Sequence, residues 1–177
     1  MLKQLAELEQ SSKERKIPIL QKEKADWLLN IIKLHKPKTI LELGTANGYS
    51  GCILGSQGAT LTTIELNPRA ADEAKINFKI HNIKAIVLIG DAVKLIKTLT
   101  QKFDLIFVDF ALTQYINVLD DCLRLSKEGT ILIADNINLE VQRNTGIKHC
   151  KDFKERIIKE LHTEIIEIGD GISYSIK

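Results

Sequence analysis

The chain has 177 residues, of which 44% are apolar and 27% charged, and its formal net charge is +2. These values are ordinary for one soluble globular domain and exclude a disordered chain. The small net charge gives no indication of a nucleic acid or an anionic membrane as a partner. No apolar run exceeds six residues, whereas a membrane-spanning helix needs ~20.

The N-terminus and the cysteines both favour a cytoplasmic protein. Residues 1–7 mix leucine with charged and polar residues and lack the apolar core of a signal peptide. Cys52, Cys122 and Cys150 are odd in number and have no C-x-x-C spacing. This pattern argues against a disulfide framework or a zinc site, and it is typical of a reducing compartment.

Two helices are expected before the first strand. The segment 2–16 places leucines at helical spacing among charged residues, and Pro18 ends that pattern. The segment 22–35 carries its apolar residues on one side. We expect a single domain over residues 1–177, with residues 1–36 as an N-terminal helical extension. The first helix suits a contact between two copies, a flap over an acceptor site, or a cover for its own sheet.

Strands and helices alternate through the middle of the chain. Short β-branched and aliphatic runs predict five strands, at 39–43, 59–65, 85–89, 103–108 and 130–134. Helical or loop segments follow the first four strands, at 47–56, 68–81, 91–100 and 114–125. Continuous apolar strands that alternate with helices predict a doubly wound, mostly parallel α/β sheet that is covered on both faces.

The C-terminal segment has a different pattern. A helix is expected at 151–161, and the segments 163–168 and 172–176 flank Gly169-Asp170-Gly171. That tripeptide is a hairpin signal, because glycine adopts positive φ without strain. An antiparallel hairpin added to the five parallel strands predicts a seven-stranded, Rossmann-like sheet.

Polar residues follow the predicted strands at the edge where open α/β sheets bind ligands. The loop 44–50 follows the first strand, Glu65 closes the second, and Asp91 and Ala92 follow the third. Acidic and amide residues follow the fourth and fifth strands, namely Asp109, Asp135 and Asn136. We expect these side chains to form one pocket.

The first loop favours an adenosine ligand that carries positive charge. Gly44 and Gly48 allow a tight turn and a close approach to a ligand, and Glu65 can accept hydrogen bonds from both ribose hydroxyls. The loop lacks the G-x-G-x-x-G spacing of a dinucleotide site, which disfavours a nicotinamide-dependent oxidoreductase. Glu42 precedes the loop, and an acidic side chain suits a sulfonium and an ammonium better than a diphosphate. The expected ligand is S-adenosylmethionine.

Two strings are specific enough to suggest a family: L-E-x-G-T-x-x-G-Y-S at 41–50 and Ala134-Asp135-Asn136. Shorter matches accompany them at Thr63-Ile64-Glu65, Gly90-Asp91-Ala92, Phe107-Val108-Asp109, Gly129-Thr130 and Gly169-Asp170-Gly171. From about residue 17 to the C-terminus, the chain resembles the cation-dependent, catechol-type O-methyltransferases. That family is a branch of the class I S-adenosylmethionine-dependent methyltransferases.

The resemblance implies a cofactor site and a metal site. The cofactor-binding residues that it implies are Glu42, Gly44, Thr45, Gly48, Tyr49, Ser50, Glu65, Asp91, Ala92 and Asp109. It also implies a divalent cation, usually Mg²⁺, bound by Asp109, Asp135 and Asn136. Carboxylate and amide oxygens suit such a hard cation. The structural alternative for Asp135 and Asn136 is a helix cap or a turn.

One departure from the family concerns the proton acceptor. The family usually has lysine three residues after the first metal-binding aspartate, and this chain has Leu112 there. Leucine cannot act as a base, so the catalytic residue stays unassigned. Either the metal alone acidifies the acceptor, or Lys148 or His149 reaches the site, or ordinary catechol chemistry is lost. We expect an acceptor other than a plain catechol.

The resemblance leaves the acceptor open. It implies a small hydroxylated molecule, but some relatives methylate a hydroxylated uridine in tRNA, and the few aromatic residues here give little support for RNA. The segment 137–150, expected to cover the acceptor site, carries basic residues that suit an anionic acceptor or a solvated loop. A non-catalytic module that binds S-adenosylmethionine is the alternative from another class, and Leu112 favours it.

Overall fold

The sheet has seven strands in the order β3-β2-β1-β4-β5-β7-β6. The computed structural model describes residues 5–138 and 147–177, without the side chains of 147–149. The strands are β1 (Thr39–Leu43), β2 (Thr60–Glu65), β3 (Ala85–Ile89), β4 (Phe103–Val108), β5 (Ser126–Asp135), β6 (His162–Ile166) and β7 (Ile172–Ile176). The first five are parallel, and β7 runs antiparallel to both β5 and β6. The predicted fold class is confirmed.

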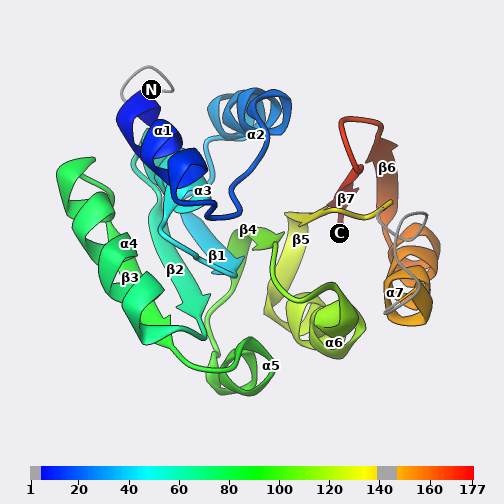
Figure 1. Cartoon of the computed structure of the whole chain (residues 1–177). Coiled ribbons are helices and arrows are strands. Elements are labelled where there is room, and N and C mark those ends of the chain that lie inside the picture. The colour runs from blue at the N-terminus through cyan, green and yellow to red at the C-terminus, as the bar shows by residue number, and fades with distance from the viewer. Residues whose placement is uncertain (1–4, 139–146) are drawn as a thin grey trace.

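Helices cover both faces of the sheet (Figure 1). One layer consists of α1 (Ala6–Glu14), α2 (Lys22–His35), α3 (Tyr49–Leu54) and α4 (Pro68–Ile80), and the other of α5 (Ala92–Leu95), α6 (Tyr115–Leu125) and α7 (Ile147–Glu160). Alternate residues of β4 enter the two cores, since Phe107 packs in the first layer and Ile106 in the second. No described helix is long and apolar enough to cross a membrane.

Some element boundaries differ from the sequence-based prediction. α3 begins two residues later than predicted because Gly48, with φ +89°, forms its N-cap. The predicted helix 91–100 is a single α turn, α5, followed by a 3₁₀ turn at Ile96–Thr98. β5 begins four residues earlier than predicted, because Ser126 pairs with Phe103 ahead of an irregularity in the ladder. α7 begins at Ile147, four residues ahead of the predicted start.

The winding of the sheet reverses at β1, which lies between β2 and β4. Leu43, the last residue of β1, is in register with Ile64 and with Val108. The chain segments that leave these three strands therefore emerge side by side at the carboxyl edge. Backbone hydrogen bonds extend this alignment beyond the strands: Gly44 N donates to Ile64 O at 3.0 Å, and Asp109 N donates to Leu43 O at 2.9 Å. This is the edge at which open α/β sheets bind ligands.

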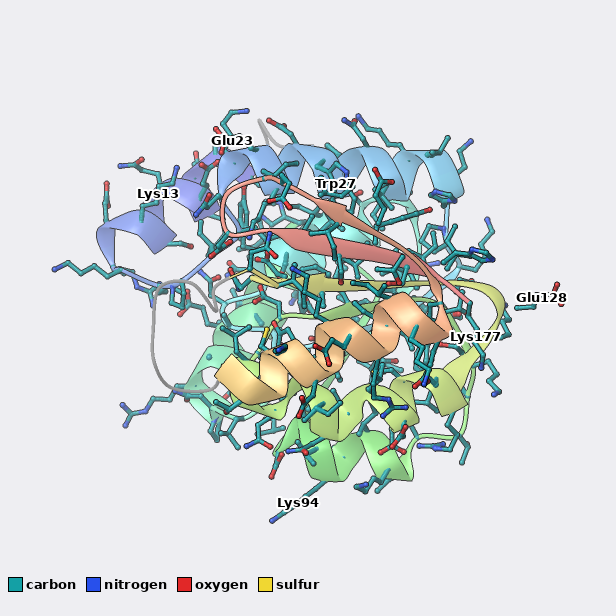
Figure 2. The ribbon with its side chains drawn as sticks, turned by 90° about the vertical axis from the view of Figure 1, so that its right-hand side faces the viewer. Lys13, Glu23, Trp27, Lys94, Glu128 and Lys177 are labelled. Carbon is teal, nitrogen blue, oxygen red and sulfur yellow. The ribbon has the colours of Figure 1, made fainter. Side chains whose placement is uncertain are left out.

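The N-terminal segment packs on this same chain. Leu5 is fully buried in the first core, and Arg15 donates to the Glu73 carboxylate of α4 at 2.7 Å. The hairpin of β6 and β7 lies between α2 and α7 (Figure 2), and Trp27 of α2 meets Tyr174 of β7 edge-on, with ring centroids 6.2 Å apart. The two N-terminal helices therefore pack against the rest of the fold.

Candidate active site

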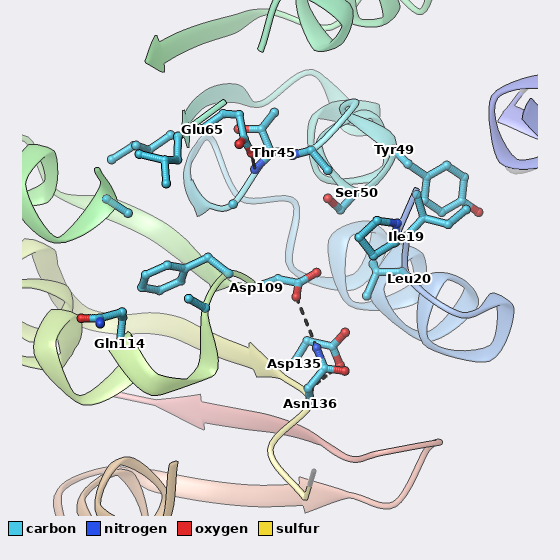
Figure 3. A pocket seen from close by; sticks show the side chains of 18 of the residues that line it. Ile19, Leu20, Thr45, Tyr49, Ser50, Glu65, Asp109, Gln114, Asp135 and Asn136 are labelled. Atoms are coloured by element: carbon cyan, nitrogen blue, oxygen red, sulfur yellow. Dashed lines mark hydrogen bonds between the residues drawn. The ribbon is translucent and has the colours of Figure 1, made fainter. Parts of the chain in front are cut away.

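A cavity of about 880 Å³ opens at the carboxyl edge of the sheet (Figure 3). The predicted site residues that line it are Gly44, Thr45, Tyr49, Ser50, Glu65, Asp91, Ala92, Asp109, Asp135 and Asn136. Glu42, Gly48 and Leu112 are not among its lining residues. The expectation that one pocket joins these strand ends therefore agrees with the geometry, except that Glu42 lies behind the wall.

The first loop is held in shape by Gly44 and Glu65. Gly44 has φ +95°, and a Cβ atom there would lie 2.0 Å from the Asp109 carbonyl oxygen, so only glycine fits. The amides of Thr45 and Ala46 donate to Oε2 of Glu65 at 3.2 and 2.9 Å. The end of β2 thereby fixes the loop, and the Glu65 carboxylate lies at the cavity wall.

Glu42 lies directly beneath this wall and is fully buried. Ser50 Oγ and Thr63 Oγ1 donate to its two carboxyl oxygens at 2.6 Å each. Burial raises the pKa of Glu42 to about 8, although these two hydrogen bonds oppose the shift. Glu42 is therefore mainly a neutral acid at pH 7, and hydrogen bonds link it to the cavity through Ser50 and, by way of Thr63, through Thr45.

Apolar residues and an acidic side chain form the part of the cavity near β2 and β3. Asp91 caps α5, with its Oδ1 accepting from Val93 N at 2.9 Å. Ile64, Leu66 and Val93 line the same region. A flat apolar ring with polar edges, such as adenine, suits this surface.

Asp109, Asp135 and Asn136 meet on the opposite side of the cavity (Figure 3). In one orientation of the Asn136 amide its nitrogen lies 3.4 Å from Asp109 Oδ1, but the reversed orientation forms better hydrogen bonds. Its nitrogen then donates to the two oxygens of Asp170 at 3.0 and 2.7 Å. In this reversed orientation the Asn136 amide oxygen faces Asp109 Oδ1 at 3.4 Å. Two acceptor oxygens that face each other at this distance favour a cation between them.

Asp109, Asp135 and Asn136 form an acidic edge of the cavity, and the pKa shifts of its carboxyl groups agree with a cation bound between its oxygens. Burial and the neighbouring Asp135 raise the pKa of Asp109 well above its ordinary value. Burial also raises the pKa of Asp135. No three His, Cys, Asp or Glu side chains in the described part of the chain group closely enough to hold a metal ion on their own. A metal site here would therefore depend on the Asn136 amide, and the mixed set of oxygen donors fits a hard divalent cation.

Two further residues, Lys24 and Asp170, belong to this acidic edge and were not expected from the sequence. The Lys24 ammonium donates to both Asp135 and Asp170, and only 1% of Lys24 is exposed. Burial lowers the pKa of Lys24, but its hydrogen bonds to the two carboxylates outweigh that effect, so the net shift is upward. A signal was present in the sequence, because Lys24 precedes Leu28 and Ile32 at four-residue spacing and so belongs to the buried face of α2.

The remaining wall is mostly apolar. Ile19, Leu20 and Phe110 line it together with Gln114, and Phe110 stacks on Tyr115 with ring centroids 5.5 Å apart. Leu112 is half-buried and packs against the second core instead. Of the segment 137–150, residues 139–146 and the side chains of Lys148 and His149 lie outside the described residues, so those hypotheses stay untested.

Comparison with known proteins decides the family. The family model described as "O-methyltransferase" matches residues 1–177. The chain belongs to the O-methyltransferase family. Curated members with related sequences include the catechol O-methyltransferases of mouse (32% identical over 166 residues) and pig (30% over 184 residues). The match to the mouse protein spans 82% of this chain and 60% of the mouse protein. The match to the pig protein spans 93% of this chain and 95% of the pig protein. A Niastella koreensis catechol O-methyltransferase is 33% identical over 63% of this chain and 54% of its own length.

Solved structures of the family have the same fold. A Staphylococcus aureus protein assigned to the caffeoyl-CoA O-methyltransferases superposes with a TM-score of 0.87 at 27% identity, over 98% of this chain and 91% of its own. The Bacillus cereus O-methyltransferase, crystallised with S-adenosylhomocysteine, superposes with a TM-score of 0.85 at 24% identity. That superposition covers 98% of this chain and 90% of the Bacillus cereus chain. This member of the O-methyltransferase family therefore has the Rossmann-like architecture expected from its sequence.

Proposed function

We propose that this O-methyltransferase binds S-adenosylmethionine in the 880 Å³ cavity and transfers its methyl group to a hydroxyl oxygen of a small acceptor. The observation that carries the proposal is that the glycine loop, Glu65 and Asp91 share one cavity with the acidic edge of Asp109 and Asp135. A methyl donor and an acceptor bound at these two ends would meet between them. Family membership and the S-adenosylhomocysteine complex of a structural neighbour support this assignment.

The chain's own residues would bind the donor from two sides. Glu65 already accepts from loop amides through Oε2 and from Asn67 N through Oε1 at 2.8 Å, and its remaining lone pairs would accept from the ribose hydroxyls. The apolar surface beside Asp91 would hold the adenine. The loop 44–50 would lie beside the methionine part of the cofactor, with Ser50 at the cavity wall and Glu42 behind Ser50.

The acidic edge would bind the acceptor side. Asp109, Asp135 and Asn136 would hold a divalent cation, and their oxygen donors favour Mg²⁺. The cation, when bound, would supply the positive charge that orients an acceptor hydroxyl and lowers its pKa. Phe110 and Leu20 offer apolar surfaces to the body of the acceptor. Holding the hydroxyl oxygen in line with the methyl carbon and the sulfur would provide much of the rate acceleration.

A cavity of this size that must also hold the cofactor favours a small acceptor. Because Leu112 supplies no amine to the cavity, we propose a hydroxylated acceptor that is more acidic than a plain catechol or ionises with the help of the cation alone. Cys52, Cys122 and Cys150 are all buried, and their odd number and wide spacing support a reducing, cytoplasmic location.

Two measurements test the proposal. Calorimetric titration should show binding of S-adenosylhomocysteine and none of NAD, and the reverse result would contradict the cofactor assignment. Transfer of a labelled methyl group should then be screened over phenols, other hydroxylated metabolites, total tRNA and protein extracts, with and without EDTA. We expect transfer to a small molecule that EDTA abolishes. Transfer to tRNA, or cofactor binding without transfer to any acceptor, would overturn the proposed acceptor class.

A further inference from the structure

We propose that Lys24 is a built-in counter-ion of the cation site and that it sets the affinity of this site for a divalent ion. The inference rests on the proposed function, since it assumes a cation at Asp109, Asp135 and Asn136. It goes further by assigning a role to two residues, Lys24 and Asp170, that belong to neither the donor set nor the cofactor site.

The first observation is the complete burial of a charged side chain. Lys24 is 1% exposed and lies on α2, between buried Leu20 and Leu28. A buried ammonium is costly unless it is paired and hydrogen-bonded. Its nitrogen bonds to Oδ1 of Asp135 and to Oδ1 of Asp170, and the Gly171 carbonyl oxygen lies 3.4 Å away. With the Asn136 amide reversed, these three oxygen partners match the three donors of an ammonium group.

The second observation is the formal charge of the cluster. Asp109, Asp135 and Asp170 bring three negative charges, and Lys24 brings one positive charge. The net formal charge is −2, which a single divalent cation cancels. Without Lys24 the cluster would carry −3, and it would attract cations more strongly but remain charged after binding one. Like-charge repulsion among buried carboxylates makes such an imbalance costly.

The third observation is how Lys24 divides the donor oxygens. In the described part of the chain, the hydrogen bonds to the Asp135 carboxylate all use Oδ1, from Lys24 and from Asn136 N. Asp170 is held by Lys24 and by the Asn136 amide in its better orientation. Lys24 therefore keeps Asp170 occupied as a counter-ion and orients Asp135, so that its second oxygen remains for a ligand. We describe Lys24 as a positioning residue, because it acts through Asp135.

A series of charge variants tests the inference by calorimetric titration of Mn²⁺ into the full-length protein. Lys24→Met removes one positive charge, so the net formal charge of the cluster becomes −3. Asp170→Asn changes this net charge to −1, and the double variant restores it to −2. A unit charge within a few ångströms should change the affinity by about tenfold or more. We therefore expect Lys24→Met to bind Mn²⁺ at least about tenfold more tightly, and Asp170→Asn at least about tenfold more weakly. The double variant should return to within about threefold of the wild type.

Lys22→Met is the matched control, because Lys22 lies on the same helix but is exposed and pairs with Asp26 at 2.5 Å. Its Mn²⁺ affinity should be unchanged. A second measurement separates charge from folding: the melting temperature of Lys24→Met should rise on addition of Mn²⁺ by more than that of the wild type. A purely structural role for Lys24 would instead weaken Mn²⁺ binding in Lys24→Met, and Asp170→Asn would not rescue it.

Titration of S-adenosylhomocysteine into the same samples separates this inference from the proposed function. Cofactor binding together with Mn²⁺ affinities that do not follow the charge order would overturn the role of Lys24 alone. Mn²⁺ affinities that follow the charge order without cofactor binding would support the counter-ion and overturn the proposed function. Absence of Mn²⁺ binding in the wild type and in every variant would overturn the inference.

Discussion

The hydroxyl of Ser50 at the cavity wall lies 2.6 Å from the carboxyl oxygen of Glu42 behind it, so a buried acid is linked to the ligand site through a single hydrogen bond. Glu42 has little access to solvent in any protonation state. Its charge must therefore affect the stability of the whole fold as well as the ligand site.

The first prediction concerns the dependence of stability on pH. Burial raises the pKa of Glu42 from its ordinary value of 4.5 to about 8. Between these two values the folded chain keeps a proton that the unfolded chain has lost. The free energy of unfolding should therefore fall as pH rises, by up to about 1.4 kcal/mol per pH unit from this group. Glu42→Gln should reduce the slope, measured by urea denaturation at pH 5 to 8, and equal slopes in both proteins would contradict the predicted pKa.

The second prediction concerns Gly44, where both φ and space exclude a side chain. Gly44→Ala would place Cβ 2.0 Å from the Asp109 carbonyl oxygen, so the loop or the start of the β4–α6 connection must move. Gly58→Ala is the control, because Gly58 also has positive φ but has open space around it. The control should lose roughly 1–2 kcal/mol of stability from φ alone. Gly44→Ala should lose more and should also weaken S-adenosylhomocysteine binding. Similar losses in the two variants would show that the close approach is unimportant.

The third prediction concerns Glu65. Removing its carboxylate frees the Thr45 and Ala46 amides and deletes the proposed ribose acceptor. A hydrogen bond to a charged group contributes about 1.5–3 kcal/mol, so Glu65→Ala should weaken S-adenosylhomocysteine binding at least about tenfold. Glu128→Ala, at an exposed position of β5 that does not line the cavity, should bind normally. Unchanged affinity in Glu65→Ala would place the ribose elsewhere.

The fourth prediction concerns Leu112. General base catalysis contributes roughly 10²–10⁴-fold, so an amine that reached the cavity from this position should raise the rate with a catechol by about tenfold or more. Leu112→Lys is therefore expected to gain activity on a catechol in a labelled-methyl assay. Leu112→Met keeps the packing of this half-buried position without the amine and should show no gain. If the lysine variant does not gain activity either, the idea that Leu112 restricts the acceptor is wrong.

Much of the fold could be predicted from the sequence because the strands are nearly continuous apolar runs in a sheet buried on both faces. The missed boundaries have local causes. The early start of β5 depends on an irregular pairing of Ser126 with Phe103, which leaves no apolar signal. The short α5 depends on a change to 3₁₀ geometry at Ile96.

The site was predictable only in part. Strand-end residues such as Glu65 and Asp109 could be identified because topology brings the ends of parallel strands to one edge. Lys24 could not be assigned in this way, because its partners Asp135 and Asp170 are 111 and 146 residues away in the sequence. Glu42 shows a second limit, since its position before the loop suggested contact with the ligand, and its burial behind Ser50 depends on side-chain packing.

The ion pair of Lys24 with Asp170 has a consequence for the order in which the protein matures. During synthesis α2 leaves the ribosome before β5 and before the turn between β6 and β7, so Lys24 gains Asp135 first and Asp170 only when that turn has been translated. Contacts of such long sequence separation form late in folding. A nascent chain arrested before the β6–β7 hairpin could bury most of its parallel strands, yet it would lack Asp170 and so a finished acidic edge.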